Sequence, residues 1–94
     1  MHGPELYRKY RQLIEGLADE RRSTELSLTA LHALLQQFQS EAAALEPAEA
    51  GSVCDEIADQ LEHEALRATS SHRRDVLLAA VKGFDGMLFG GAKT

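Results

Sequence analysis

Apolar residues recur every three or four positions between residues 28 and 45. This spacing places them on one stripe of an α-helix, close to the 3.5-residue repeat of a coiled-coil seam. The stripe consists of Leu28, Leu31, Leu35, Phe38, Ala42 and Leu45, and Leu34 widens it. The opposite face carries Gln36, Gln37, Gln39 and Ser40. A stripe this regular needs other helices to bury it, so the pattern predicts helix-on-helix packing.

The same spacing extends toward the N-terminus and predicts helix over residues 4–45. Its apolar positions there are Leu6, Tyr7, Tyr10, Leu13, Ile14 and Leu17. Pro4 suits a first helical position, where its missing N–H has no partner to lose. A polar neck at residues 19–24 interrupts the apolar stripe, and Ser23 or Thr24 is a candidate N-cap within it. The heptad phase continues through this neck, so the helix is either continuous or broken near residues 21–24.

The second half of the chain predicts helix over residues 52–89. Pro47 disfavours helix at the residue before it, and Ser52 is the expected N-cap. The inner face consists of Ile57, Ala58, Leu61, Ala65 and Ala68. The phase slips at a second polar neck, residues 69–75, which predicts a break near 69–72 with a cap at Ser70 or Ser71. The pair Gly90-Gly91 is expected to end the last helix.

The two halves mirror each other about a turn near Glu49. Counting outward along both arms brings the two polar necks to one height, with Asp19 and Glu20 opposite Arg73 and Arg74. The same count places the two inner arms side by side. The mirror therefore predicts an antiparallel helical hairpin.

Two packings fit this hairpin. Either the necks stay helical and two copies form a four-helix bundle, or both arms bend and one chain folds into three or four shorter helices. The last helix is apolar around most of its circumference, which favours a homo-oligomer because one neighbour covers only one side.

Composition agrees with a helical core. The 94 residues fit one domain, 44% of them are hydrophobic, and only 5% are aromatic. No stretch alternates with a period of two, so no strand is expected. The predicted fold class is all-α: an antiparallel helical hairpin or small helical bundle of two long or three to four shorter helices, in a single domain over residues 1–94.

The end of the last helix is the best candidate for partner binding, in the manner of a helix entering a groove. Plain core packing is the alternative for the same residues. The predicted partner-binding residues are Phe84, Met87, Leu88, Phe89, Leu77, Val81, Tyr10 and Leu13. The function expected from them is a non-enzymatic protein–protein interaction module (an adaptor, small chaperone or regulatory subunit) that binds a protein or a second copy of itself.

Charge adds an alternative function. The net charge is −5, and no Lys or Arg occurs between Arg22 and Arg67. Such an acidic middle disfavours direct binding to nucleic acid or an anionic membrane. The predicted acidic surface is Asp55, Glu56, Asp59 and Glu62. It is either a solvated helix face or the docking surface of an acidic inhibitor that occupies a basic site on a partner or mimics nucleic acid.

Metal binding is a weaker alternative. His32 and His63 fall at similar heights of the hairpin, and Asp59 lies one turn before His63. Two imidazoles and a carboxylate are ligands for zinc or iron, but the Glu-x-x-His pairs of di-iron bundles are missing. We therefore assign no metal site and no cofactor. No residue is placed to orient a base onto Cys54, so we expect a buried thiol and no enzyme activity.

Location follows from two absences in the sequence. The N-terminal residues 1–4 show no basic region followed by an apolar run, so no secretory signal is expected. The longest aliphatic run, residues 76–81, is far shorter than a membrane span. A cytoplasmic protein is the expectation.

Overall fold

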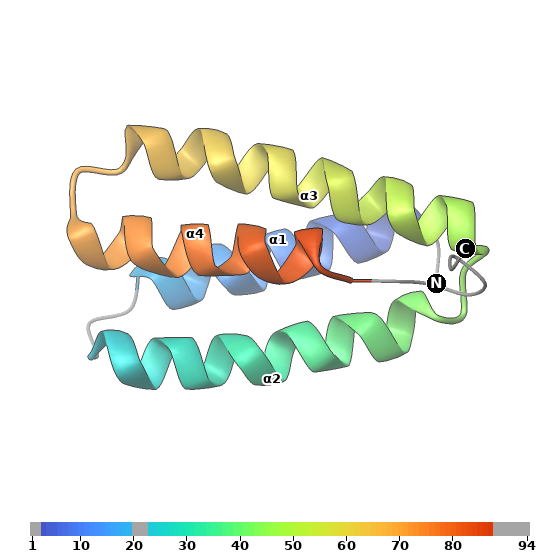
Figure 1. Ribbon diagram of the computed structural model, residues 1–94, viewed down its shortest axis with the longest axis horizontal. Helices are drawn as coiled ribbons and strands as arrows, with labels where there is room; N and C mark the ends of the chain where they lie inside the picture. Colours follow the sequence, from blue (N-terminus) through green and yellow to red (C-terminus); the bar gives the residue numbers. More distant parts are fainter. Residues whose placement is uncertain (1–2, 20–22, 88–94) are drawn as a thin grey trace.

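The computed structural model describes residues 3–19 and 23–87 and consists of four helices, with no strand in these ranges. The helices are α1 (Gly3–Asp19), α2 (Thr24–Ala42), α3 (Pro47–Arg67) and α4 (Ser71–Asp85). They form an up-down-up-down bundle, in which α1 and α3 run one way and α2 and α4 the other (Figure 1). The all-α prediction is confirmed, and it takes the form of the compact bundle of four shorter helices.

Both predicted necks are breaks between helices. Ser23 caps α2, because its Oγ accepts a hydrogen bond from the amide of Leu26 at 3.2 Å. Ser70 caps α4 in the same way, accepting from the amide of Arg73 at 3.1 Å. Each cap satisfies an amide that has no partner within its helix. Of the two candidate caps expected at each neck, Ser23 and Ser70 are the ones that the structure shows.

Other helix ends differ from the prediction. The start of α3 is Pro47, five residues before the predicted Ser52, so that prediction is wrong. Proline is favoured at the first helical position, and the residue before it, Glu46, adopts the extended conformation of an N-cap. The helix α2 ends at Ala42, short of residue 45, and α4 ends at Asp85 with Gly86 as its cap. The predicted end at Gly90-Gly91 lies outside the described residues.

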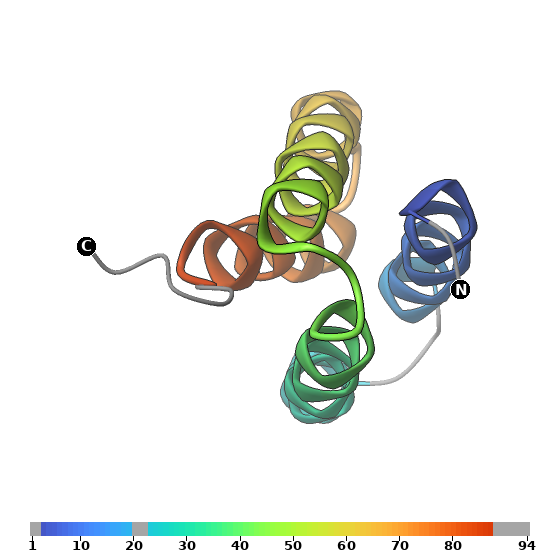
Figure 2. The same ribbon diagram turned by 90° about the vertical axis from the view of Figure 1, so that its right-hand side faces the viewer.

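The helices occupy four corners, with α2 and α3 at opposite ones (Figure 2). The connection 43–46 crosses between these corners, and α2 and α3 contact each other least of all helix pairs. The prediction that these inner arms lie side by side is wrong, because the connection spans the bundle diagonally instead of closing a tight hairpin. The side-by-side hairpins are α1–α2 and α3–α4.

Buried residues of all four helices form one core. Its centre is a row of aromatic rings, in which Phe38 lies between Tyr10 and Phe84. The ring centroids are 5.2 Å apart for Tyr10–Phe38 and 4.9 Å for Phe38–Phe84, both edge to face. This geometry is the favoured one for aromatic pairs. One ring each from α1, α2 and α4 therefore holds three helices together.

The mirrored necks meet as predicted. The last turn of α1 and the first turn of α2 lie at the same end of the bundle as the α3–α4 connection (Figure 1). There Asp19 forms an ion pair with Arg73, and Thr24 Oγ1 lies 3.0 Å from His72 Nδ1. Arg73 also approaches Glu64 at 3.5 Å. Glu20 lies outside the described residues, so only the Asp19–Arg73 part of the predicted charge layer is observed.

Within one chain, α4 contacts each of the other three helices. Val76, Leu77, Ala80 and Phe84 are buried by these contacts. Three helices of the same chain therefore cover the apolar sides of α4. Burial of α4 does not require a second copy of the chain.

Candidate docking surface around α2

The helix α2 is nearly free of charge. It carries no Lys or Arg, and its only carboxylates are Glu25 in the first turn and Glu41 in the last. The exposed positions between them are Leu26, Leu28, Thr29, His32, Ala33, Gln36, Gln37, Gln39 and Ser40. Solvated helix faces normally carry charged residues, whereas the centres of protein interfaces are depleted of them.

Glu41 is neutralised locally. Its carboxylate accepts hydrogen bonds from Lys9 Nζ at 2.9 Å, from the Tyr10 hydroxyl at 2.7 Å and from Gln37 Nε2 at 3.3 Å. These donors, Lys9 first, lower the pKa of Glu41 to about 2. Burial, and after it the hydrogen bond to Glu41, raise the pKa of Tyr10 above its ordinary value. The carboxylate of Glu41 is therefore paired within the chain, and Glu25 is the remaining acid of α2.

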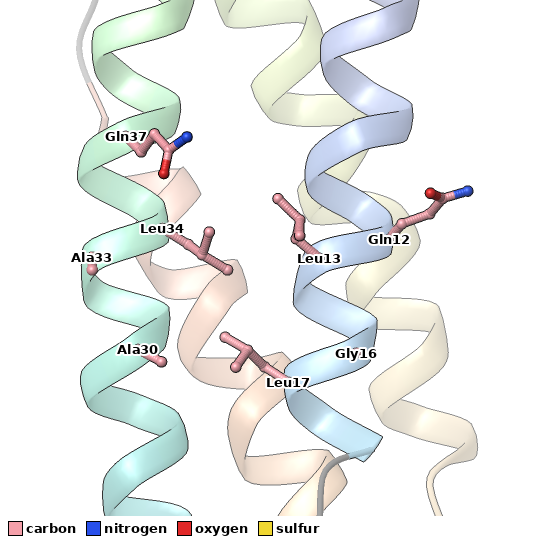
Figure 3. A pocket seen from close by; sticks show the side chains of 8 residues that line it. All are labelled: Gln12, Leu13, Gly16, Leu17, Ala30, Ala33, Leu34 and Gln37. Carbon is pink, nitrogen blue, oxygen red and sulfur yellow. The ribbon is translucent and has the colours of Figure 1, made fainter.

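An apolar groove of about 460 Å³ runs between α1 and α2. Figure 3 shows Leu13 and Leu17 of α1 and Leu34 of α2 pointing into the space between the two helices. The lining residues are Gln12, Leu13, Gly16, Leu17, Ala30, Ala33, Leu34 and Gln37. The groove exists because Gly16, Ala30 and Ala33 are too small to fill it, and no atom lies within 4 Å of where a Cβ of residue 16 would be.

Two further grooves lie on the other side of α2, against α4. The first has about 530 Å³ and includes Leu28 and Leu78, which are 36% and 40% exposed. The second has about 400 Å³ and includes His32, Leu35 and Met87. Among the described residues α2 is thus bordered by hollows on both flanks. We name the exposed positions of α2 together with the linings of its flanking grooves the α2 face.

Leu26 extends the α2 face toward the neck. It is 59% exposed and precedes Ala30, Ala33 and Gln37 by four, seven and eleven residues, which places all four on one side of the helix. Leu13 is 41% exposed on the opposite wall of the α1–α2 groove. Large apolar side chains that gather along a groove, instead of lying singly on a surface, are typical of interaction sites.

The predicted partner-binding residues divide into four groups. Tyr10, Leu77 and Phe84 are buried in the core of this chain, while Val81 and Met87 are half-buried against it. Leu13 lies in the α1–α2 groove, and Leu88 and Phe89 fall outside the described residues. Most of the described residues in this predicted set thus pack in or against the core. Three of them, Leu13, Val81 and Met87, also line grooves beside α2.

The end of α4 also closes over the single cysteine. Cys54 is buried, and its Sγ donates to the carbonyl of Phe84 at 3.3 Å and lies 3.9 Å from Met87 Sδ. Burial raises the pKa of this thiol to about 12, with smaller effects from Asp55 and Asp85. The thiol therefore stays protonated and packs as a small hydrophobe, as expected from the sequence.

The predicted acidic surface is exposed along α3. Asp55, Glu56, Asp59 and Glu62 are all exposed, and Asp59 lies 3.8 Å from His63 on the same helix. These carboxylates lie away from α2, since α2 and α3 occupy opposite corners (Figure 2). The acidic surface and the α2 face are therefore separate.

The two histidines considered as metal ligands do not share a site. His32 is exposed on α2, whereas His63 on α3 places its Nδ1 2.9 Å from the carbonyl of Asp59. Across residues 3–19 and 23–87, no group of three or more His, Cys, Asp or Glu side chains is arranged to hold a metal ion. The weaker alternative that brought His32 and His63 together required α2 and α3 to lie side by side, and these helices occupy opposite corners of the bundle.

None of the helices in the described ranges combines the length and apolar character that a membrane crossing requires. No family model, no curated protein and no solved structure matches this chain.

Proposed function

We propose that this protein is a non-enzymatic interaction module that binds a helix of another polypeptide on the α2 face. The observation that carries the proposal is the pairing of an almost uncharged helix with apolar grooves on both of its flanks. An amphipathic helix lays its apolar side chains into grooves of this kind at a spacing of three and four residues. An adaptor, a small chaperone or a regulatory subunit acts through such contacts.

The chemistry of the face defines the partner. Leu13, Leu26 and Leu34 offer apolar contact, while Gln12 and Gln37 at the rim both donate and accept hydrogen bonds. The expected partner is a helix with short or apolar side chains and few charges on its contacting side. A strongly basic or acidic helix gains little here, because Glu41 is already paired with Lys9.

Site-specific photo-cross-linking in the native cell tests this function. A photoreactive amino acid at position 33 is expected to give discrete cross-linked products, and the same group at position 66 is expected to give none. Leu66 is the matched control, because it is 80% exposed on α3, the helix at the opposite corner of the bundle from α2 (Figure 2). Leu26→Glu should abolish the products formed from position 33, whereas Leu66→Glu should leave them unchanged. Equal products from both positions, or none from position 33, contradict the proposal.

A second candidate function is that of an acidic inhibitor. It is favoured by the exposure of Asp55, Glu56, Asp59 and Glu62 along a helix whose only basic residue is Arg67. Such binding depends on salt, because exposed charges are screened beyond a Debye length of about 8 Å at physiological ionic strength. Titration with a Lys-rich peptide should show affinity that falls with added salt and with Asp59→Asn and Glu62→Gln. Salt-independent binding, or none, excludes this candidate.

A further inference from the structure

We infer that the α2 face is covered by the α2 face of a second copy of this chain, so that the protein is a symmetric dimer. The inference rests on the proposed function and names the partner of the same surface. It is argued from the distribution of charge over the bundle and from the position of small residues along α2.

Charge favours this face over the others. The chain has a net charge of −5, and exposed carboxylates line α3, so two copies that meet through α3 oppose like charges. Of the two acids on α2, Glu41 is compensated by Lys9, and Glu25 at the other end has no ion pair within residues 3–19 and 23–87. The grooves between α2 and α4 add one charge of each sign, Asp75 and Lys82. A largely apolar surface with so little net charge can pair with a copy of itself, and a C2 dimer requires this self-complementarity.

The small residues define where two copies of α2 cross. Ala33 is the central residue of the 19-residue helix α2, and it is exposed. A symmetric antiparallel crossing at Ala33 lets the two helix axes approach to the short end of the usual 8–10 Å range. Glycine and alanine near the crossing, Gly16 and Ala30, leave hollows for the side chains of the second copy.

The same crossing accounts for the exposed leucine. Leu26 lies seven residues before Ala33, so it comes opposite Ser40 of the other copy, seven residues after it. There it reaches the end of the α1–α2 groove that Leu13 and Gln37 mark. Each of the two leucines thus fills a hollow in the other chain, and both lose contact with water.

Sedimentation of the purified protein tests the inference. Between about 5 and about 500 µM the wild type is expected to sediment with twice the mass of one 10.3 kDa chain. Leu26→Glu and Ala33→Glu are expected to weaken the dimer roughly 100-fold or more, since each buries a carboxylate in the interface. Leu66→Glu and Ala48→Glu make the same chemical changes at exposed positions of α3 and should leave the dimer intact. Circular dichroism of each variant verifies that the chain remains helical.

Disulfide trapping tests the crossing point. In a Cys54→Ala background, Ala33→Cys is expected to form a disulfide across the symmetry axis, because the two Cα atoms then lie within about 7 Å. Leu66→Cys, equally accessible, should form far less. Trapping that is no faster at position 33 than at position 66 overturns the antiparallel crossing.

The two proposals fail in different ways. A wild type that stays monomeric at about 500 µM overturns the dimer. If position 33 still cross-links to a different protein, the proposed function stands with another partner. If Leu66→Glu disrupts the dimer as strongly as Ala33→Glu does, the dimer interface is not the α2 face. If position 33 also gives no cross-links, the proposed function is overturned as well.

Discussion

The hydroxyl of Tyr10 donates a hydrogen bond of 2.7 Å to the carboxylate of Glu41, which ties α1 to the last turn of α2. Lys9, one residue away, binds the same carboxylate oxygen at 2.9 Å. Through this contact a charged group stabilises the bundle at the edge of an otherwise uncharged face.

Glu41→Gln should reduce stability at neutral pH by about 1 kcal/mol, because a charge-assisted contact to Lys9 and Tyr10 is weakened at a partly exposed site. The folded pKa of Glu41 is about 2, below its ordinary value of 4.5. A lowered folded pKa stabilises the protein above the unfolded pKa, and this contribution is lost as the pH falls through the folded pKa. Urea unfolding followed by circular dichroism should therefore show the difference between variant and wild type narrowing from pH 4.5 toward pH 2. A difference that is constant with pH contradicts the assignment.

Phe38→Ala should be among the most destabilising single changes in the chain. Phe38 is fully buried between Tyr10 and Phe84, so its loss leaves a cavity and removes two edge-to-face contacts. The expected cost is about 3–5 kcal/mol, a large part of the stability of a small domain. Urea unfolding measures it, with Leu66→Ala at an exposed site as the control. Similar losses for both variants would show that the aromatic row is not the centre of the core.

Gly83→Ala should gain less stability than alanine normally brings to a helix interior. A Cβ at residue 83 would overlap Cδ1 of Leu35, so α2 or the leucine side chain must move. Gly51→Ala is the control, because nothing lies within 4 Å of its Cβ position, and it should gain up to about 1 kcal/mol. Leu35→Ala removes the side chain that a Cβ at residue 83 would overlap. In a double-mutant cycle, Gly83→Ala should therefore increase the free energy of unfolding more in the Leu35→Ala background than in the wild type, as measured by thermal and urea unfolding. Additive effects of the two changes would contradict this contact.

Cys54 should resist thiol reagents in the folded protein. It is buried, and its pKa of about 12 leaves almost no thiolate, the reactive form, at pH 8. Reaction with an aromatic disulfide reagent, followed by absorbance, should be slow in buffer and fast in urea. Leu66→Cys supplies an exposed thiol in the same chain for comparison, because Leu66 is 80% exposed. Rapid labelling of native wild-type protein would show that the end of α4 opens readily.

Features that depend on local residue spacing were predicted better than the choice of neighbouring helices. Capping depends on the residues around a helix start, and the candidates at the two necks included Ser23 and Ser70. Counting residues outward from the turn placed Asp19 and Arg73 at the same height, where they form an ion pair. The choice of neighbouring helices depends on how apolar stripes of similar width pack against one another in three dimensions. Residue spacing along the chain does not determine this choice. The four residues between Ala42 and Pro47 allow either a hairpin or a diagonal crossing.

The α2 face was not predicted, for a related reason. Leu28 belongs to a regular apolar stripe that was expected to be buried, and Leu13 was assigned to a partner site centred on the last helix. Both are partly exposed in grooves beside α2. A signal was present in the sequence, since residues 26–40 contain no Lys, Arg, Asp or Glu. The glutamines of this segment indicated a solvated face when the helix was considered alone.

The diagonal connection at residues 43–46 belongs to neither of the two side-by-side hairpins. Cutting the backbone there would yield two fragments of nearly equal length, each with a helical hairpin and part of the aromatic and aliphatic core. Neither fragment alone could shield its apolar side chains, so each would require the other to fold. The chain is therefore suited to fragment complementation, with recovery of helicity on mixing as the direct readout of core assembly.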